Sequence, residues 1–253
     1  MKTWFKNNSN QEYHQGEGVS STELVDILRS PAYYKASREA RVETPAMRLG
    51  TYIHESVLEP DKFDPSTVEV LDGRTKVGSP AYERKKVEWL ALIQACTDAV
   101  RSEPEAMKLL SEGEAELSCY LENGGLIRKC RSDWINRKAG YIVDLKTTSA
   151  KTFDELLKSI MAFRYDVSQS NYREIVSHAL YDGLTIPDFY WIFVSKEAPH
   201  NVWVVKPSED MLEHGLECVE KALKIYQECS VSSVWPKEDA GPYLVEYPSW
   251  YRR

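Results

Sequence analysis

The chain has 253 residues and a mass of 29.1 kDa, and 42% of its residues are hydrophobic, which is enough for a substantial core. No apolar run approaches membrane-spanning length, the start lacks the apolar centre of a secretory signal, and the five cysteines never stand at CxxC spacing. These features favour a cytoplasmic globular protein without disulfides, and the net charge of −7 gives no overall attraction to nucleic acid.

Residues 1–110 are expected to be mainly helical. The run VSSTELVDILRSP has a Ser or Thr cap before an apolar stripe and ends at a proline, and a second helix is expected from 32 to about 40. Pro45 begins a third helix, TPAMRLGTYIHESVLEP, in which His54 lies beside the apolar stripe. A charged helix is expected over 80–100.

From residue 111 the hydrophobic pattern changes from a helical to a strand-like period. Residues 111–253 are expected to form a single domain together with 1–110. Three strand-like runs, AELSCYLE, LIRKCRSDWI and GYIVDLKTT, are separated by the turn segments ENGG and NRKAG, which predicts an antiparallel meander. Two helices, TFDELLKSIMAF and SQSNYREIVSHALYDGL, come next, followed by strands DFYWIFVSK and VWVVK and a long amphipathic helix over 208–229. The expected class is therefore α/β (α+β), with a mixed sheet flanked by helices and an aromatic tail.

Charge is distributed unevenly along the chain. The segment 128–173 carries five more basic than acidic residues, so the rest of the chain has a net charge of −12. A charge run is most often a solvated face, but this one encloses the two acids Asp133 and Asp144, which stand in strand-like runs.

The two acids are expected to face each other. If the hairpin turns at Lys138 and Ala139, cross-strand pairing places Asp133 opposite Asp144, and like charges in that position destabilise a sheet. Protonation of one acid or a cation between them resolves the conflict. Mg²⁺ suits the second solution, because it prefers oxygen ligands and leaves coordination positions for water and phosphate.

Lys146 lies two residues after Asp144 and therefore shares its face of the strand. A cation there can stabilise the charge of a phosphoryl transition state or orient the attacking water. The alternative is a surface ladder of Asp and Lys. The apolar neighbours of these residues in YIVDL favour the end of a buried strand instead.

Asp, a spacer and Asp-x-Lys within this order of elements resemble the PD-(D/E)xK nuclease superfamily. More closely, the chain resembles the RecE (exonuclease VIII) type of phage and prophage exonuclease. The pieces that carry the resemblance follow the family's order over about 20–181, and they are SPAYY, TPAMRLGTYIHESVLEPDKF, AELSCYL, CRSDWI, IVDLKTT and RYDVSQSNY. The resemblance implies a restriction-endonuclease-like core with a helical N-terminal extension.

The resemblance also implies a site. Its metal ligands are His54, Asp133, Asp144 and the carbonyl of Leu145, and the metal is Mg²⁺, for which Mn²⁺ substitutes. Lys146, Asp144 and Asp133 are the implied catalytic residues. Glu116, on the first strand of the meander, matches a further family acid and joins them.

DNA contacts are expected from the basic segment and from the helix after it. Arg131 is a candidate phosphate contact, and Arg128 and Arg173 belong to the same group of DNA-binding candidates. The family has Gln four residues before Tyr; here Tyr172 matches the family Tyr, whereas Gln169 stands three residues before it. Gln169 and Tyr172 are the candidates for positioning the DNA strand or nucleotide.

The implied activity is digestion of linear double-stranded DNA from its ends, 5′ to 3′, leaving 3′ single strands for a RecT-like annealing protein in a bacterial cytoplasm. A homo-oligomeric ring, tetrameric as in RecE, is expected, with basic segments along its channel and Trp235, Trp250 and Tyr251 suited to subunit contacts. Three alternatives stay open: a CRISPR-associated or other superfamily nuclease of different polarity, a non-catalytic DNA-end-binding module, and a protein whose paired acids hold a structural cation.

Overall fold

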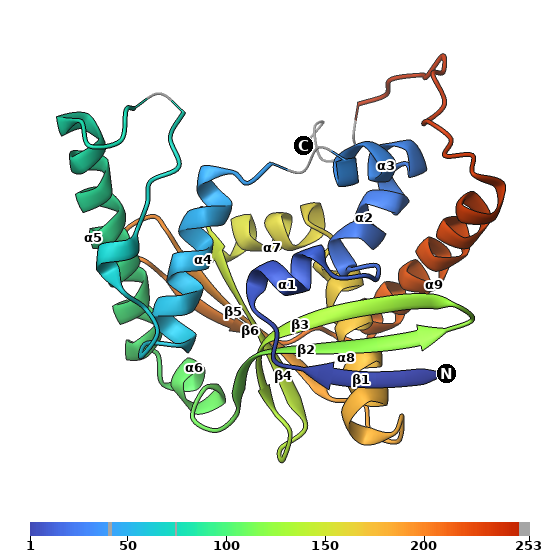
Figure 1. Ribbon diagram of the computed structural model, residues 1–253, viewed down its shortest axis with the longest axis horizontal. Coiled ribbons are helices and arrows are strands. Elements are labelled where there is room, and N and C mark those ends of the chain that lie inside the picture. Colours follow the sequence, from blue (N-terminus) through green and yellow to red (C-terminus); the bar gives the residue numbers. More distant parts are fainter. Residues whose placement is uncertain (40–41, 74, 248–253) are drawn as a thin grey trace.

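A six-stranded mixed sheet forms the centre of the computed structural model, which describes residues 1–39, 42–73 and 75–247 (Figure 1). The strands follow one another across the sheet in chain order, and β4 and β5 are parallel while all other neighbours are antiparallel. The strands are β1 (Lys2–Lys6), β2 (Glu114–Asn123), β3 (Leu126–Asn136), β4 (Tyr141–Thr148), β5 (Asp188–Ser195) and β6 (Val202–Val205). The expected meander is therefore confirmed as β2–β3–β4.

Helices cover both faces of this sheet, and most of them begin at the caps that the sequence supplies. Ser20 and Glu23 form a capping box, and the side chains of Thr44, Ser79 and Ser208 each accept a hydrogen bond from a backbone N–H in the first turn. The helices are α1 (Asn10–Gln15), α2 (Ser21–Arg29), α3 (Pro31–Glu39), α4 (Pro45–Leu58), α5 (Pro80–Ser102), α6 (Pro104–Leu109), α7 (Phe153–Ala162), α8 (Tyr165–Tyr181) and α9 (Glu209–Ser232).

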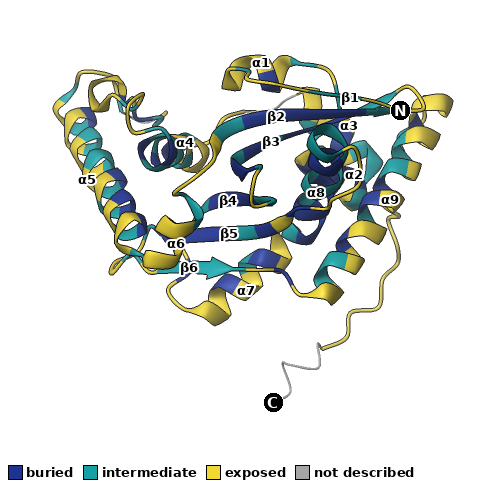
Figure 2. Cartoon of the chain, turned by 90° about the horizontal axis from the view of Figure 1, so that it is seen from below, coloured by how far each residue is buried: buried dark blue, intermediate teal, exposed yellow. Residues whose placement is uncertain are grey.

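Strand β4 shows why both faces need helices. Ile142 belongs to the core between the sheet and helices α7 and α8, whereas Val143 and Leu145 belong to the core beneath α4 and α5. All three side chains are fully buried, and the strands of the centre are dark in Figure 2 while the outer faces of the helices are exposed. An apolar strand without polar alternation is typical of a sheet covered on both sides.

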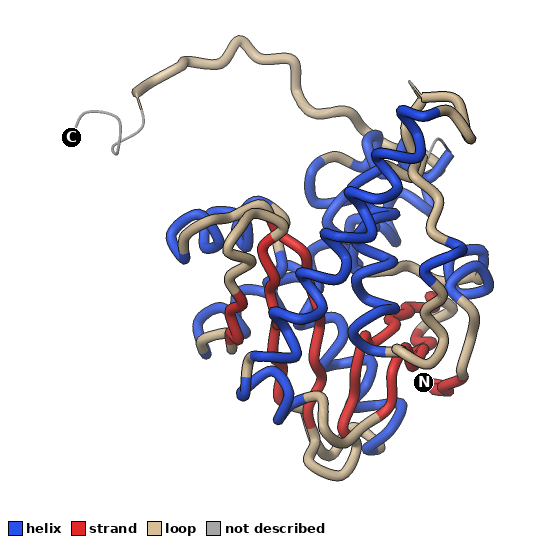
Figure 3. Tube along the Cα trace, turned by 90° about the vertical axis from the view of Figure 1, so that its left-hand side faces the viewer, coloured by secondary structure: helices blue, strands red, loops and turns tan. Residues whose placement is uncertain are grey.

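A third apolar cluster joins the first helices to the last one. Val25 and Tyr34 of α2 and α3 pack with Val167 of α8 and Val219 of α9. Trp235, just after α9, also contacts this cluster through Tyr34, with ring centroids 5.2 Å apart. The carbonyl of Pro236 accepts a hydrogen bond from the backbone N–H of Ala32, and the described residues beyond it run away from the body of the protein (Figure 3).

Four short elements were not expected from the sequence, namely β1, α1, α6 and the 3-10 helix η1 (Pro65–Thr67). Strand β1 pairs with β2 at the edge of the sheet, where Trp4 stacks on Tyr120 with ring centroids 5.1 Å apart. Helix α8 begins at Tyr165, three residues before the expected start. Among the described helices, none has the length and apolar character needed to cross a membrane. The α/β class with a restriction-endonuclease-like mixed sheet is confirmed.

Candidate active site

The site lies where strands β3 and β4 separate. Their ladder consists of Asn136–Tyr141, Ile135–Ile142 and Trp134–Val143, the register expected from the sequence. The next position of this register would pair Asp133 with Asp144, and there the ladder ends. Beyond that point β3 follows β2, while β4 follows β5 in a different direction (Figure 1).

The ladder between β2 and β3 is interrupted at the same level. Ala115 pairs with Trp134 and Leu117 with Ser132, so Glu116 and Asp133 stand opposite each other without a ladder pairing. The backbone of Glu116 has a φ of 60°, in the left-handed region that side chains rarely adopt. A non-glycine residue in this conformation changes the direction of its side chain, and such residues cluster at active sites; here the side chain is a carboxylate.

Three metal-binding side chains from three elements meet at this point. His54 of α4, Glu116 of β2 and Asp133 of β3 each offer a ligand atom within 4.8 Å of the others. The His54 Nδ1 atom lies 3.6 Å from an Asp133 carboxylate oxygen. Two carboxylates and one imidazole suit a divalent cation that takes oxygen and nitrogen ligands, so the donor set fits the metal that the resemblance implies.

Asp144, which is buried, and Lys146, which is partly buried, form an ion pair beside this cluster. The Lys146 ammonium donates to a carboxylate oxygen of Asp144 at 2.5 Å and lies 3.9 Å from an oxygen of Asp133. The backbone N–H of Leu145 donates to Asp133 at 2.8 Å. The structure therefore assembles all the acids and the lysine expected from the sequence, but Glu116, rather than Asp144, stands in the three-residue donor cluster.

Burial and crowding shift the pKa values of these groups. Burial, reinforced by the Asp133 charge, raises the pKa of Asp144 to about 7, and the same two causes raise the pKa of Glu116 to about 8. Burial and the nearby Lys146 ammonium lower the pKa of His54 to about 4, although a hydrogen bond with the backbone of Leu145 opposes them. The imidazole is thus neutral at physiological pH and offers a lone pair to a metal.

Lys146 responds differently to burial. Burial alone would lower its pKa, but the carboxylates of Asp144 and Asp133 outweigh that effect and raise the pKa above its ordinary value. The side chain therefore stays an ammonium at every physiological pH.

A cavity of about 680 Å³ opens over the donor cluster. The cavity is also lined by residues that were not predicted from the sequence. They include Thr51 and Glu55 of α4 and Glu59, which caps the C-terminal end of that helix. Their spacing of four residues places them on one helical face beside His54, a signal that the sequence did contain. The loop Asn7, Asn8 and Ser9 also lines the cavity.

Two of the DNA-binding candidates line this cavity. Arg131 bonds the Glu116 carboxylate at 2.8 Å and the side chain of Asn10 at 3.0 Å. Tyr172 also lines the cavity and packs against Phe189.

The other three candidates lie elsewhere. Gln169 is fully buried, and its amide bonds the Asp166 carbonyl and Ser170, so it does not reach the cavity. Arg128 is 5% exposed and forms a bidentate ion pair with Glu174. Arg173 donates to the carbonyl of Pro187, away from the cavity. The structure gives these three residues intramolecular roles, so the expectation that they contact DNA is not supported.

Ion pairs with acidic residues also break up the positive charge of the basic segment 128–173. The residues of this segment that form ion pairs with carboxylates are Arg128, Arg131, Arg137, Lys146, Lys151 and Arg164. The excess positive charge counted along the sequence is therefore not one continuous basic surface.

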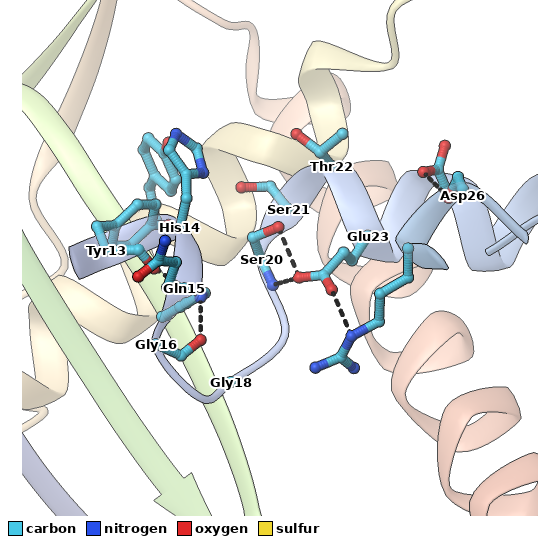
Figure 4. Close-up of a pocket in the computed structure, with 14 residues that line it drawn as sticks. Tyr13, His14, Gln15, Gly16, Gly18, Ser20, Ser21, Thr22, Glu23 and Asp26 are labelled. Atoms are coloured by element: carbon cyan, nitrogen blue, oxygen red, sulfur yellow. Dashed lines mark hydrogen bonds and ion pairs between the residues drawn. The ribbon is translucent and has the colours of Figure 1, made fainter. Parts of the chain in front are cut away.

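A second cavity of about 440 Å³ adjoins the first, and Tyr13, His14 and Tyr172 line both. Its far side is formed by the N-terminal turn of α2, with Ser20 and Glu23 joined in their capping box (Figure 4). The two cavities together extend from the donor cluster to α2.

Comparison with known proteins identifies the family. The model of the PDDEXK-like domain of unknown function (DUF3799) matches residues 20–242. A candidate exonuclease from Eubacterium rectale has a similar fold, with a TM-score of 0.67, 14% identity and 96% of each chain covered. A phage-related exonuclease from Haemophilus somnus 129PT matches with a TM-score of 0.38 and 16% identity over 89% of this chain and all of that one. No curated protein matches. The site geometry and the family match together support a nuclease, and the chain belongs to the PDDEXK-like DUF3799 family.

Proposed function

We propose that this protein is a Mg²⁺-dependent exodeoxyribonuclease that hydrolyses phosphodiester bonds at the ends of linear double-stranded DNA, with Mn²⁺ able to substitute. One observation carries the proposal: His54, Glu116 and Asp133, from three separate elements, converge in an open cavity beside the Asp144–Lys146 ion pair. A structural cation would not need an open cavity or a paired lysine beside it.

His54, Glu116 and Asp133 would hold the cation. When bound, it supplies the positive charge that polarises a phosphodiester and acidifies a water molecule. Asp144 lies next to Asp133 and holds the Lys146 ammonium at 2.5 Å. In this scheme Asp144 positions the lysine and lies on the same side of the metal site as Asp133.

Lys146 has an electrostatic function in this proposal. Because its pKa is raised, it does not take a proton from water and so is not a general base. Its ammonium can instead donate hydrogen bonds to the attacking water or to a phosphate oxygen. A fixed positive charge in a partly buried position stabilises the additional negative charge of the transition state.

Arg131 and Tyr172 are the residues placed to hold the DNA strand. Arg131 already forms an ion pair with Glu116 and can exchange part of that pairing for a contact with a DNA phosphate. The second cavity beyond Tyr172 provides room for nucleotides on one side of the reacting phosphate. This arrangement supports action on a strand that ends close to the site.

The finer parts of the proposal rest on the resemblance to RecE-type enzymes. They are 5′ to 3′ polarity, production of 3′ single strands for a RecT-like annealing protein, phage or prophage origin with action in the bacterial cytoplasm, and assembly as a homo-oligomeric ring. Of the aromatic residues expected at subunit contacts, Trp235 packs on its own domain, and Trp250 and Tyr251 lie outside the described residues.

Digestion of end-labelled DNA tests this proposal. Linear duplex labelled at the 5′ or the 3′ end is incubated with Mg²⁺, with Mn²⁺ or with EDTA, next to a covalently closed circle of the same sequence. We expect mononucleotide release from the linear duplex with either metal, and no cleavage of the circle. Cleavage of the circle would show an endonuclease, and no cleavage of any substrate with either metal would refute the nuclease.

A further inference from the structure

A second cluster of metal-binding side chains lies outside the active-site cavity, between α8 and α9. Asp166 stands in the first turn of α8, and His214 and Cys218 stand one turn apart on α9. The three offer a carboxylate oxygen, an imidazole nitrogen and a sulfur atom within 4.8 Å of one another. Residues at i and i+4 share one face of a helix, which is a common way for one helix to supply two metal ligands.

The two helices approach closely enough to bring these ligands together because Gly215 lies at their contact. A Cβ atom at position 215 would meet the backbone oxygen of Asp166 at 2.2 Å and the Ser170 hydroxyl at 2.5 Å. Only glycine allows this approach, and the residue stands directly after His214. The backbone geometry therefore fixes the distance between α9 and Asp166.

The ligand atoms are separated by distances close to those of a tetrahedral site. With zinc bonds of ordinary length, the nitrogen and sulfur of such a site lie about 3.6 Å apart, and the nitrogen and oxygen about 3.3 Å. The measured distance from His214 Nε2 to Cys218 Sγ is 3.6 Å, and that from His214 Nε2 to Asp166 Oδ2 is 3.9 Å. Asp166 is 5% exposed and His214 lies at the surface, so adjustment by His214 is enough to close the remaining gap.

In the structure the positively charged side chain of Arg164 contacts this cluster. The Arg164 guanidinium donates to Asp166 at 2.8 Å and to the Cys218 sulfur at 3.0 Å through the same Nη2 atom. Arg164 has a φ of 54°, the left-handed conformation that is unfavourable for a non-glycine residue. Its side chain is one-third exposed, so it can leave without rearrangement of the core.

We propose that Asp166, His214 and Cys218 form a binding site for Zn²⁺ or a similar thiophilic divalent cation, which joins α8 to α9 and replaces the Arg164 side chain. Binding removes the thiol proton of Cys218, so a thiolate and a carboxylate neutralise the two charges of the metal, and water completes the tetrahedron. This ligand set differs from the active site, which contains no sulfur. Mg²⁺, which prefers oxygen ligands, therefore does not compete for it.

Cobalt absorption spectroscopy tests the proposal, because Co²⁺ replaces Zn²⁺ and a thiolate ligand produces a charge-transfer band in the near ultraviolet. The full-length protein is titrated with Co²⁺ in the presence of excess Mg²⁺. We expect one equivalent of metal to produce the band, and added Zn²⁺ to remove it. Cys218→Ser should eliminate the band, and His214→Gln should weaken Co²⁺ binding at least about tenfold, since it removes one of three protein ligands.

Cys229→Ser is the matched control, because Cys229 lies on the same helix and outside the cluster. This variant should keep the band. Arg164→Gly removes the competing guanidinium and suits the left-handed backbone, so we expect it to bind Co²⁺ more tightly than the unchanged protein. Absence of a thiolate band in the unchanged protein, or its persistence in Cys218→Ser, would refute the site. Neither result would bear on nuclease activity.

Discussion

Glu116 stands directly opposite Asp133 at the position where the β2–β3 ladder is interrupted. Two carboxylates in that arrangement repel each other, and the repulsion contributes to the raised pKa of Glu116. The left-handed backbone of Glu116 adds strain at the same point. A protein accepts both costs where a bound cation offsets them, which is the physical reason for treating this position as the centre of the site.

Asp144→Asn and Lys146→Ala are each expected to reduce DNA cleavage by about a hundredfold or more, as for removal of one preorganised charge at a transition state. Both side chains lie beyond the last pair of the β3–β4 ladder and form an ion pair with each other rather than packing in an apolar core, so the fold should persist. Cleavage is measured on linear duplex after circular dichroism has shown the folded state.

Asp154→Asn and Lys158→Ala are the matched controls for these two variants. They make the same chemical changes at exposed positions of α7 and should cleave at the unchanged rate. A folded Asp144→Asn or Lys146→Ala protein that cuts as fast as its control would show that the site is assigned wrongly.

His54→Ala is expected to weaken binding of Mg²⁺ or Mn²⁺ by more than about tenfold, because even residues that only support a metal ligand have effects of that size. DNA affinity measured without metal should change little, since a neutral imidazole attracts phosphate weakly. Calorimetric metal titration and a DNA-binding assay provide the two values. His178→Ala, on α8, is the control. Equal metal affinity in both variants would show that His54 has a purely structural function.

The stability of the metal-free protein is expected to fall as the pH rises from about 5 to 8. Asp144 and Glu116 have folded pKa values of about 7 and about 8, above the value of about 4 for an unfolded carboxyl. In this pH range the two folded carboxyls hold protons that the unfolded chain has released, so raising the pH favours unfolding. His54, whose folded pKa is lowered to about 4, opposes this effect below its unfolded pKa of about 6.5, so the fall in stability is steepest above that pH.

Urea denaturation in EDTA at several pH values measures this effect. Asp144→Asn and Glu116→Gln should each flatten the dependence, because a neutral amide does not titrate. Excess Mg²⁺ should reverse it at pH 8 by binding the folded state alone. A stability of the metal-free protein that rises over the same range would contradict the raised pKa values.

Arg131→Ala is expected to weaken DNA binding for all sequences and to lower the slope of binding against salt concentration by about one, the signature of one lost phosphate contact. Arg128→Ala tests the specificity of this result. Arg128 is buried against Glu174, so its removal should lower the midpoint of urea unfolding and leave the salt slope unchanged. If both variants changed the slope equally, the assignment of Arg131 to the DNA surface would be wrong.

A homo-oligomer is expected in solution, as the resemblance to RecE-type enzymes implies. The charge distribution agrees with this expectation, because a protein with a net charge of −7 and a divided set of basic residues attracts DNA weakly as a single subunit. Several active-site cavities around one channel would hold the strand between cleavage events. Light scattering at micromolar concentration measures the mass. A mass near 29.1 kDa together with distributive digestion would reject the ring and leave the nuclease proposal intact.

The sequence by itself determined the β2–β3–β4 meander and the register that places Asp133 level with Asp144. These features depend on short-range information, namely turn residues and the alternation of faces along neighbouring strands. The position of Lys146 beside Asp144 follows from the same two-residue period. The family resemblance, not periodicity, was needed to connect His54 to these residues.

Only the tertiary structure decided which of the polar residues face the cavity. Glu116 enters the donor cluster because its backbone leaves the extended conformation, which no residue pattern indicated. Arg128 is paired with Glu174 instead of facing the cavity, and Gln169 is buried where α8 packs against the sheet and α9. Each of these outcomes depends on contacts between elements far apart in the chain. A side chain's type limits its chemistry, but its neighbours decide whether that chemistry is directed at a partner within the fold or at a ligand.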